Sequence, residues 1–438
     1  LRLPTPNLFT NIILVVFIAT AILGLFVFSG AIPLGKQGSD NVPQGTVVLW
    51  GTVKSGDISK PLEDFNRINI NAFSVVYEEK SPDTFDSDLL EALASGAGPD
   101  MFFISDDLAY KYSNKIYTIP YTSFSTNTFK NNFVGAGEVF LTSKGVLAFP
   151  LSVDPLMMYY DRSILDASGV AYPPTYWDEL VNLVPILNKK NEQGLLTRST
   201  VAMGQFSNIL NAKDILASLF LQSGNTIVAE KSGTFTSMLN DTASGGNSSD
   251  ALKFYTDFAD PLSPSYSWNK GFANSRDAFS RGEVAFYFGF ASEFEELVNK
   301  NPNQDFGVVS IPQVKGRNSK LTYGHTTGIA ISSFSKNFNT AFTAAGLMTK
   351  GDFASKLSTA LGIAPARRDL ISITPTDAYL PTFYASAFFA KSWLDPSEKG
   401  TNDIWKGMIE KVLSNSLSAD QSINDASAKL RLLLVPKI

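Results

Sequence analysis

The alternation of strands and helices near the start of the chain most limits what it can fold into. Apolar and β-branched runs at 46–50, 73–79 and 99–105 predict three strands. Helical patterns at 61–69 and 84–95 separate these strands. Strands that alternate with helices form parallel βαβ units, so the sequence predicts an α/β fold.

The rest of the chain continues this mixture with a larger share of helix. The stretch LAFPLSVDPLMMYY at 147–160 begins as a buried strand, yet it carries Asp154 in its middle. With 438 residues the chain is long enough for two domains, each with its own core. Strands are predicted within 276–289 and at 305–312 and 328–335, and helices at 175–189, 213–224, 248–260 and over most of the tail from Thr401.

The charge and the scarcity of histidine and cysteine exclude several function classes. The formal net charge is −5, so the chain has no basic footprint for a nucleic acid. The absence of cysteine excludes thiol nucleophiles, disulfides and Cys-ligated zinc. The single histidine, His325, cannot form the paired motifs of His-rich metal sites. The sequence therefore predicts neither a metal nor a cofactor.

An apolar run near the amino terminus predicts a membrane-directed segment. Residues 12–28, IILVVFIATAILGLFVF, have about the length that spans a bilayer as a helix. One interpretation is a signal peptide cleaved after Ala31. The other is an uncleaved signal anchor, which we favour because cleavable apolar regions run to only about 7–15 residues. Arg2 on the amino-terminal flank then predicts an exported binding domain, held near the cell membrane by the short polar linker 36–45.

The order of the segments resembles a known family, the extracellular solute-binding proteins of ABC importers, family 1, the group that includes maltose-binding protein. The likeness extends over nearly all of residues 46–435. The runs that contain ASGAGPD and PPTYWDEL are its most specific pieces. In chain order the matching pieces are TVVLW, LLEALASGAGPDMFF, GVLAFPLSVDPLMMYYDRSIL, PPTYWDELVNLVPIL, DAFSRGEVAFYFG, DFGVVSIP, GIAISS and GIAPARRDL.

The resemblance implies a two-lobed periplasmic-binding-protein fold of type II, with two α/β lobes joined by a hinge of crossing strands. The solute would bind in the cleft between the lobes, and an ABC permease would receive it. We expect a monomer that binds a saccharide. With the anchor at 1–35 and the linker at 36–45 taken from composition, the resemblance implies lobe 1 at 46–150 plus about 315–365, and lobe 2 at 151–314 plus about 366–438.

Acidic and aromatic residues beside the expected cleft are candidate ligand contacts. Ligand sites in α/β sheets lie beyond the carboxyl ends of the strands. Trp50 and Lys54 flank the turn after the first strand, and Asp106 and Asp107 follow the third. Asp154 needs a partner for its carboxylate among apolar neighbours. Local structural roles compete with these assignments, namely an N-cap after the third strand and an Asp–Pro turn at Asp154.

The resemblance adds candidates from the second lobe. The loop Gln205–Ser207 matches a family loop that carries an aromatic contact, and Phe290 falls near a position where sugar-binding relatives often place tryptophan. Phenylalanine stacks less well, so the resemblance does not specify a maltodextrin. His325 lies near a crossover, where we expect a hydrogen-bonded loop residue. The full set of expected ligand-binding residues is Trp50, Lys54, Asp106, Asp107, Asp154, Phe206, Ser207, Trp268, Phe290 and Trp405.

Competing functions remain at this point. A glycosidase would need two carboxylates at a set separation, for which Asp107, Asp154 and Glu293 are available. The resemblance favours binding rather than catalysis. A polyamine would suit acidic and aromatic walls and is the main rival to a sugar. A sensory ligand-binding domain is a third alternative.

Overall fold

The computed structural model describes residues 44–242, 246–317 and 319–435, which belong to one compact unit. The apolar segment 12–28 lies outside the described residues. Among the helices of the described ranges, none combines the length and apolar character needed to cross a membrane.

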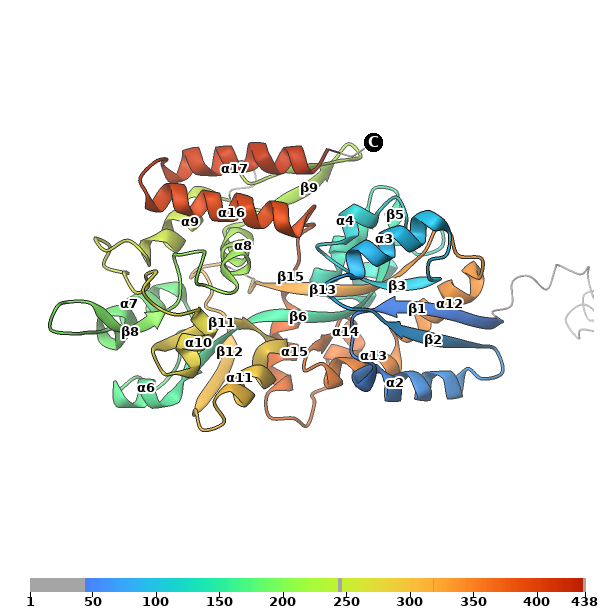
Figure 1. The fold of residues 1–438 in the computed structure, drawn as a ribbon, viewed down its shortest axis with the longest axis horizontal. Coiled ribbons are helices and arrows are strands. Elements are labelled where there is room, and N and C mark those ends of the chain that lie inside the picture. Colours follow the sequence, from blue (N-terminus) through green and yellow to red (C-terminus); the bar gives the residue numbers. More distant parts are fainter. Residues whose placement is uncertain (1–43, 243–245, 318, 436–438) are drawn as a thin grey trace, which may run out of the picture. The chain divides into compact units, whose positions relative to one another are not determined.

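One sheet runs through the described part of the chain in the order β2-β1-β3-β13-β6-β11-β8-β7 (Figure 1). β1 pairs in parallel with β2 and β3, as the strand–helix alternation predicts. β12 and β14 also pair with β6, and β15 pairs with β13. The strands are β1 Gly45–Gly51, β2 Phe73–Glu79, β3 Met101–Ser105, β6 Ala148–Asp161, β7 Lys189–Lys190, β8 Leu196–Val201, β11 Val284–Phe290, β12 Phe306–Ser310, β13 Thr322–Ile331, β14 Ala364–Pro365 and β15 Ala390–Lys391.

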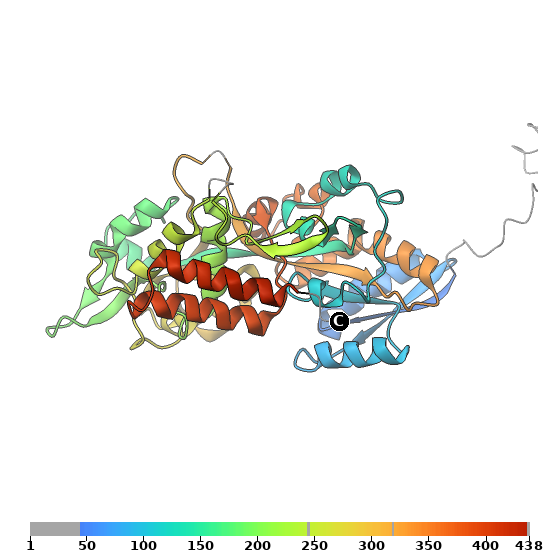
Figure 2. The same ribbon diagram turned by 90° about the horizontal axis from the view of Figure 1, so that it is seen from above.

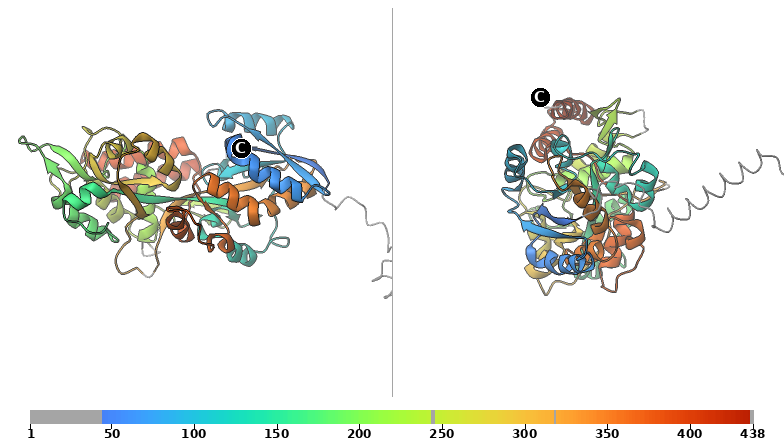
Figure 3. Two further views of the ribbon diagram at one scale, coloured as in Figure 1. Left: turned by 90° about the horizontal axis from the view of Figure 1, so that it is seen from below. Right: turned by 90° about the vertical axis from the view of Figure 1, so that its right-hand side faces the viewer.

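Lobe 1 is built around β1, β2 and β3. Its helix α3 ends at Gly96, whose φ of 72° gives the left-handed turn that glycine favours. Helix α2 begins at Ser55 rather than at the expected Pro61, which lies inside it. α2 packs against α13 on the outside of this lobe (Figure 3). The remaining elements are α2 Ser55–Ile68, α3 Phe85–Ser95, α4 Ala109–Tyr112, α5 Thr126–Asn132, η2 Gly135–Phe140, β4 Leu141–Thr142, β5 Gly145–Val146, α12 Phe338–Met348 and α13 Gly351–Ala360. The helix α14 Arg368–Ile371 packs on α5 of this lobe, although it lies beyond the expected boundary near residue 366.

Lobe 2 is built around a helix, α8, that is buried along nearly its whole length. α16 and α17 form a pair that packs on this lobe and faces the viewer in Figure 2. α15 packs on β6, β12 and β14, close to the junction of the lobes. The elements are α6 Arg162–Ala167, α7 Trp177–Leu187, α8 Ala212–Ser223, β9 Val228–Lys231, β10 Thr234–Ser237, α9 Ser248–Asp257, α10 Ser275–Ser280, η3 Ala291–Glu293, α11 Phe294–Lys300, α15 Leu380–Phe388, α16 Glu398–Leu413 and α17 Ala419–Leu433.

Two long antiparallel strands, β6 and β13, join the lobes. The first half of β6 pairs with β13, and its second half pairs with β11 and β12 of lobe 2. Proline is rare inside sheets because it lacks an N–H group and adds bulk. Here Pro150 stands opposite Gly328 and Pro155 opposite Gly324. Each proline therefore faces a residue with no side chain.

The residues between these two Pro–Gly pairs carry polar groups across the junction. His325 stands opposite Asp154 in the β6–β13 ladder. The sequence predicts a strand only from residue 328, but β13 begins at Thr322. The expectation that His325 lies in a loop is therefore wrong, because pairing with β6 extends the strand over polar residues.

Gly204 follows β8 at the start of the loop that leads to α8. The backbone conformation and close packing of this loop can be tested at Gly204. Its φ is +95°, and a Cβ atom there would lie 2.6 Å from the backbone nitrogen of Ala259. Gly169 also has a positive φ, +71°, but has nothing within 4 Å of such an atom.

We expect Gly204→Ala to lower the free energy of unfolding by about 3 kcal/mol or more, since a steric clash adds to the backbone strain. The matched change Gly169→Ala should cost only about 1–2 kcal/mol. Urea denaturation of both variants measures the difference. Equal losses would show that the loop around Gly204 can move to accommodate the added methyl group without a further loss of stability.

Candidate functional site

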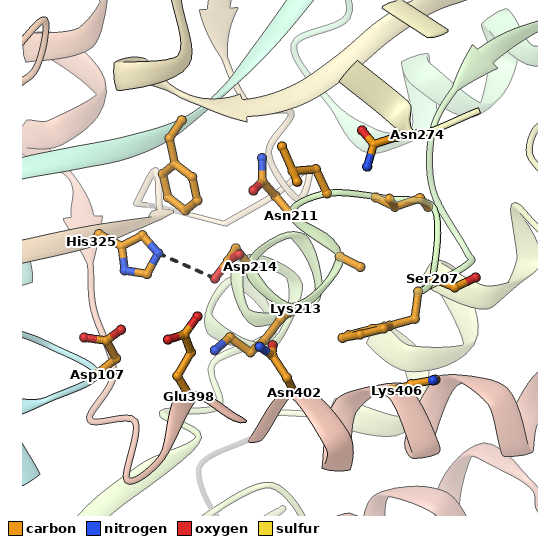
Figure 4. Close-up of a pocket in the computed structure, with 15 residues that line it drawn as sticks. Asp107, Ser207, Asn211, Lys213, Asp214, Asn274, His325, Glu398, Asn402 and Lys406 are labelled. Atoms are coloured by element: carbon orange, nitrogen blue, oxygen red, sulfur yellow. Dashed lines mark ion pairs between the residues drawn. The ribbon is translucent and has the colours of Figure 1, made fainter. Parts of the chain in front are cut away.

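A pocket of about 580 Å³ lies at the junction of the lobes (Figure 4). Lobe 1 contributes Asp107, just after β3, and the crossing strand β13 contributes His325. The remaining wall comes from lobe 2, from the 206–211 loop, the first turn of α8, Asn274, Phe290 at the end of β11, and one face of α16. The lining is therefore mixed, with carboxylates and amides beside two phenyl rings.

His325 is held by a carboxylate that has no contact with solvent. Asp106 is 0% exposed, and its Oδ1 lies 3.2 Å from His325 Nδ1. The Tyr323 hydroxyl donates to Asp106 Oδ2 at 2.7 Å, and the Thr326 N–H donates to Oδ1 at 3.1 Å. Burial acts to raise the pKa of Asp106, but the charge of His325 and these donors outweigh it, so the pKa lies below its ordinary value.

The same contact makes His325 a cation. Burial acts to lower its pKa, but Asp106 above all, with help from Asp214 and Asp107, raises the pKa of His325 to about 10. Its side chain is 36% exposed, and its ring lies 4.6 Å from that of Phe290. The imidazolium therefore forms a fixed positive point on the pocket wall at neutral pH.

Asp214, in the first turn of α8, is the most deeply buried carboxylate of the pocket wall. The residue is 7% exposed, and its Oδ1 accepts no hydrogen bond. That oxygen lies 4.0 Å from His325 Nε2, too far for a hydrogen bond (Figure 4). Burial raises the pKa of Asp214. Its neighbour Lys213 does not neutralise it directly, because the Lys213 ammonium donates to Asp395 at 2.9 Å.

Asp107 is a second carboxylate of the wall with no basic partner in direct contact. It accepts a hydrogen bond from the hydroxyl of Ser105. Burial and the adjacent charge of Asp106 raise the pKa of Asp107 to about 6. Asp107 is therefore ionised at neutral pH, although burial and the charge of Asp106 disfavour its ionised form.

A buried network under the lobe 2 wall holds two lining residues in place. Asn211 Nδ2 donates to Glu293 Oε1 at 2.7 Å and to the Phe288 carbonyl at 3.2 Å. The amide oxygen of Asn211 is thus left for the pocket (Figure 4). Glu293 also accepts the Phe290 N–H at 2.9 Å and Arg276 Nε at 3.1 Å. Glu293 therefore positions both an amide and an aromatic ring.

Four of the residues expected from the sequence line this pocket: Asp107, Phe206, Ser207 and Phe290. Asp106 lies beneath it and acts through His325. Asp154 does not line it. Its Oδ1 accepts the Ser292 N–H at 3.1 Å, and burial raises its pKa to about 6.

The tryptophans and Lys54 lie elsewhere. Trp268 and Trp405 are both 0% exposed, and they stack on Phe272 and Trp393 with ring centroids 4.5 and 5.3 Å apart. Trp50 is covered by the Lys80 ammonium, 3.6 Å from its ring centroid. Lys54 is an exposed residue at the start of α2. Large aromatic side chains contribute most to cores, and here the two fully buried rings do so.

Several lining residues carry no clear signal in the sequence. Asp214 resembles an ordinary acidic residue of a helix first turn, and Asn211 an ordinary cap. Glu398, Asn402 and Lys406 follow one another at intervals of four, so they share one face of α16. That spacing was available in the sequence, but nothing there shows that the face borders a pocket.

Two α/β lobes joined by crossing strands, with a polar pocket at the crossing, define a binding protein of the two-lobed class. Residues 56–350 match the family described as bacterial extracellular solute-binding protein. This chain belongs to that family.

Comparisons with individual proteins agree with this assignment. Binding proteins of Brucella abortus and Brucella suis are each 21% identical over 365 residues, which cover 78% of this chain and 81% of theirs. A cyclo/maltodextrin-binding protein solved with maltotetraose is 15% identical, covers 90% of this chain and 98% of its own, and superposes with a TM-score of 0.71.

Two further solved structures are similar. The sugar-binding protein MalE of Xanthomonas citri is 18% identical, with a TM-score of 0.69, over 89% of this chain and 97% of its own. The GacH receptor of Streptomyces glaucescens, solved unliganded and with acarbose, is 16% identical, with a TM-score of 0.64, over 89% of this chain and 98% of its own. At these identities the likeness establishes the fold.

The state of His325 can be measured directly because the chain has a single histidine. We expect its ring ¹H–¹³C signal to stay that of imidazolium from pH 5 to 8. Since the pKa rises from 6.5 to about 10 on folding, the contact stabilises the fold fully below pH 6.5 and loses this effect as the pH rises through about 10. Asp106→Asn should lower the midpoint by about 1 unit or more, whereas Asp369→Asn, at a distant exposed site, should leave it unchanged. A wild-type midpoint near 6.5 would contradict the ion pair.

Arg276 contacts two glutamates with very different exposure, which gives a matched pair of variants. The side chain of Glu293 is 10% exposed and that of Glu296 is 55% exposed. Glu293→Gln removes the buried partner of Arg276, which keeps only its contact with the exposed Glu296, and should lower the free energy of unfolding by about 3 kcal/mol. Glu296→Gln should cost less than about 1 kcal/mol. Denaturant titration measures the free energy of unfolding of both variants. A similar loss in both would show that burial does not determine how much each ion pair stabilises the protein.

Proposed function

We propose that this chain is the carbohydrate-binding receptor of an ABC importer and that its solute binds in the pocket at the lobe junction. The observation that carries the proposal is the chemistry of the lining, in which hydrogen-bond acceptors lie beside aromatic rings. A sugar ring has apolar C–H faces and a polar edge of hydroxyls. Pockets for such ligands combine apolar surface with a few convergent polar groups. The saccharides named for the similar solved structures support the same class of ligand.

In this proposal each part of the wall has a role. Phe206 and Phe290 stack on the faces of the sugar. The amide of Asn211 and the carboxylate of Asp214 accept hydrogen bonds from hydroxyls, and Asp107 does so from the lobe 1 side. Ser207 and Asn274 border the outer part of the pocket. We assign no ligand contact to Trp50, Lys54, Trp268 or Trp405, and none to Asp154.

The proposed mechanism is binding followed by closure of the lobes. A ligand shifts a conformational equilibrium only through contacts that differ between the two states. Hinge motion of two lobes around a bound solute is a common form of such a shift. Contacts from lobe 2 together with Asp107 from lobe 1 would favour the closed arrangement, which a permease would then recognise.

We further propose that residues 12–28 anchor the receptor, as a monomer, on the outer side of the cell membrane. The support is the apolar composition of that segment and its length. A tether keeps the receptor near its permease. It would suit a cell that has no outer membrane to confine a freely diffusing receptor.

A polyamine-binding function is the second candidate, and the acidic residues favour it. Asp107, Asp214 and Glu398 all line the pocket, and none has a lysine or arginine within ion-pair distance in the described part of the chain. Amines would be attracted to these charges.

A thermal-shift screen of the full chain in detergent tests the proposed function. The panel holds neutral mono- and oligosaccharides, amino sugars and spermidine. A ligand that binds only the folded state raises the melting temperature by mass action. We expect at least one saccharide to do so, and Phe290→Ala to weaken its binding about tenfold through lost stacking. Phe334→Ala, at an exposed site outside the pocket, is the control. A shift with spermidine alone, or with nothing, would overturn the carbohydrate function.

A further inference from the structure

The pocket carries more negative charge than its own cations neutralise. At the end near β13 there are two cations, His325 and Lys213, and each already has a buried carboxylate partner. Asp106 holds His325 at 3.2 Å, and Asp395 holds Lys213 at 2.9 Å. Three further carboxylates line the same pocket, namely Asp107, Asp214 and Glu398. Lys406 lies toward the opposite end of the view in Figure 4 from Asp107.

One of these surplus carboxylates has an oxygen with no hydrogen bond. Asp214 Oδ1 is buried and unpartnered, on a residue that is 7% exposed. An unsatisfied buried polar group is costly, and a water, ion or ligand outside the chain is one way in which native structures complete it. The raised pKa values of Asp214 and of Asp107, the latter at about 6, agree with charges that lack compensation.

We propose that the solute is a saccharide with a basic nitrogen, whose ammonium group binds between Asp214 and Asp107. This inference rests on the proposed carbohydrate function and narrows its ligand. The ammonium lies beside the carboxylates of Asp214 and Asp107 and supplies the positive charge that the lining lacks. Charge-assisted hydrogen bonds of this kind are about twice as strong as neutral ones.

The neutral lining distinguishes this ligand from a simple polyamine. Asn211, Asn274, Asn402 and Ser207 offer amide and hydroxyl groups around the rest of the pocket. The methylene chain of a polyamine would leave these groups without partners, which disfavours binding. Ring hydroxyls satisfy them, and Phe206 and Phe290 provide stacking surface for a ring.

Three trisaccharides that share one β-1,4-linked backbone isolate the charge. The glucosamine trimer carries an amine at each C2, the N-acetylglucosamine trimer a neutral amide, and cellotriose a hydroxyl. Isothermal titration calorimetry of the full chain at pH 6.5 measures all three, with spermidine as the fourth probe. We expect the glucosamine trimer to bind at least about tenfold more tightly than cellotriose.

Asp214→Asn tests the assigned group because it keeps the shape and removes the charge. We expect it to reduce affinity for the glucosamine trimer about tenfold and to change cellotriose binding less than about threefold. Asp166→Asn removes one negative charge from an exposed position on α6, outside the pocket, and should change neither affinity. Thermal unfolding of each variant shows that the fold is retained.

The possible outcomes separate the inference from the function on which it rests. Equal affinity for the glucosamine trimer and cellotriose, or an equal loss of both in Asp214→Asn, overturns the basic nitrogen and leaves the carbohydrate receptor standing. Binding of a neutral trimer alone has the same meaning. Binding of spermidine alone overturns both. Failure of every probe overturns the inference, while the wider saccharide panel still decides the function.

Discussion

The pairing of β6 with β13 is the interaction on which the rest of this structure depends. The two strands are shared by both lobes, so their ladder sets the position of every residue at the junction. Two prolines lie inside this ladder, where proline is normally excluded, and each is placed opposite a glycine. A Cβ atom at Gly324 would lie 3.1 Å from both Val153 Cγ1 and Ala390 Cβ, so that position has little room for a side chain. The crossing is therefore specified on both strands together.

A second constraint follows from placing ionised groups at such a crossing. Asp106 has no exposed surface, and it remains charged because His325, Tyr323 and Thr326 all serve its two oxygens. The Asp106 N–H also donates to the Thr326 carbonyl at 3.1 Å, which ties the loop after β3 to β13. The positive charge of His325 is therefore compensated mainly by Asp106. It does not fully neutralise Asp107 and Asp214 as well, so the pocket has an excess of carboxylates although three cations line its wall.

The sequence predicts the backbone of this protein better than its pocket. Strand and helix periodicity predicted β1, α3, β2, β3 and α8 closely, because each has a buried face or a glycine stop that is local in sequence. The extension of β13 to Thr322 could not be predicted locally, since polar residues form strand there only through pairing with β6. The rule for α/β sheets led to Asp107 and to Asp106 beneath it. It did not lead to Asp214 and Asn211, whose local pattern is that of any helix start.

The unequal shares of the two lobes in the wall bear on how binding is coupled to closure. Lobe 2 supplies the two phenyl rings, the amides and Asp214, whereas lobe 1 supplies Asp107. Contacts made equally in open and closed arrangements add affinity but shift no population. Under the proposed function, affinity thus resides mainly in lobe 2, and Asp107 is the group whose contact depends on closure. A ligand with a positive charge gains most from that contact, because Asp107 is already crowded by the charge of Asp106. The carboxylate of Asp107 would then respond both to the charge of the ligand and to closure of the lobes.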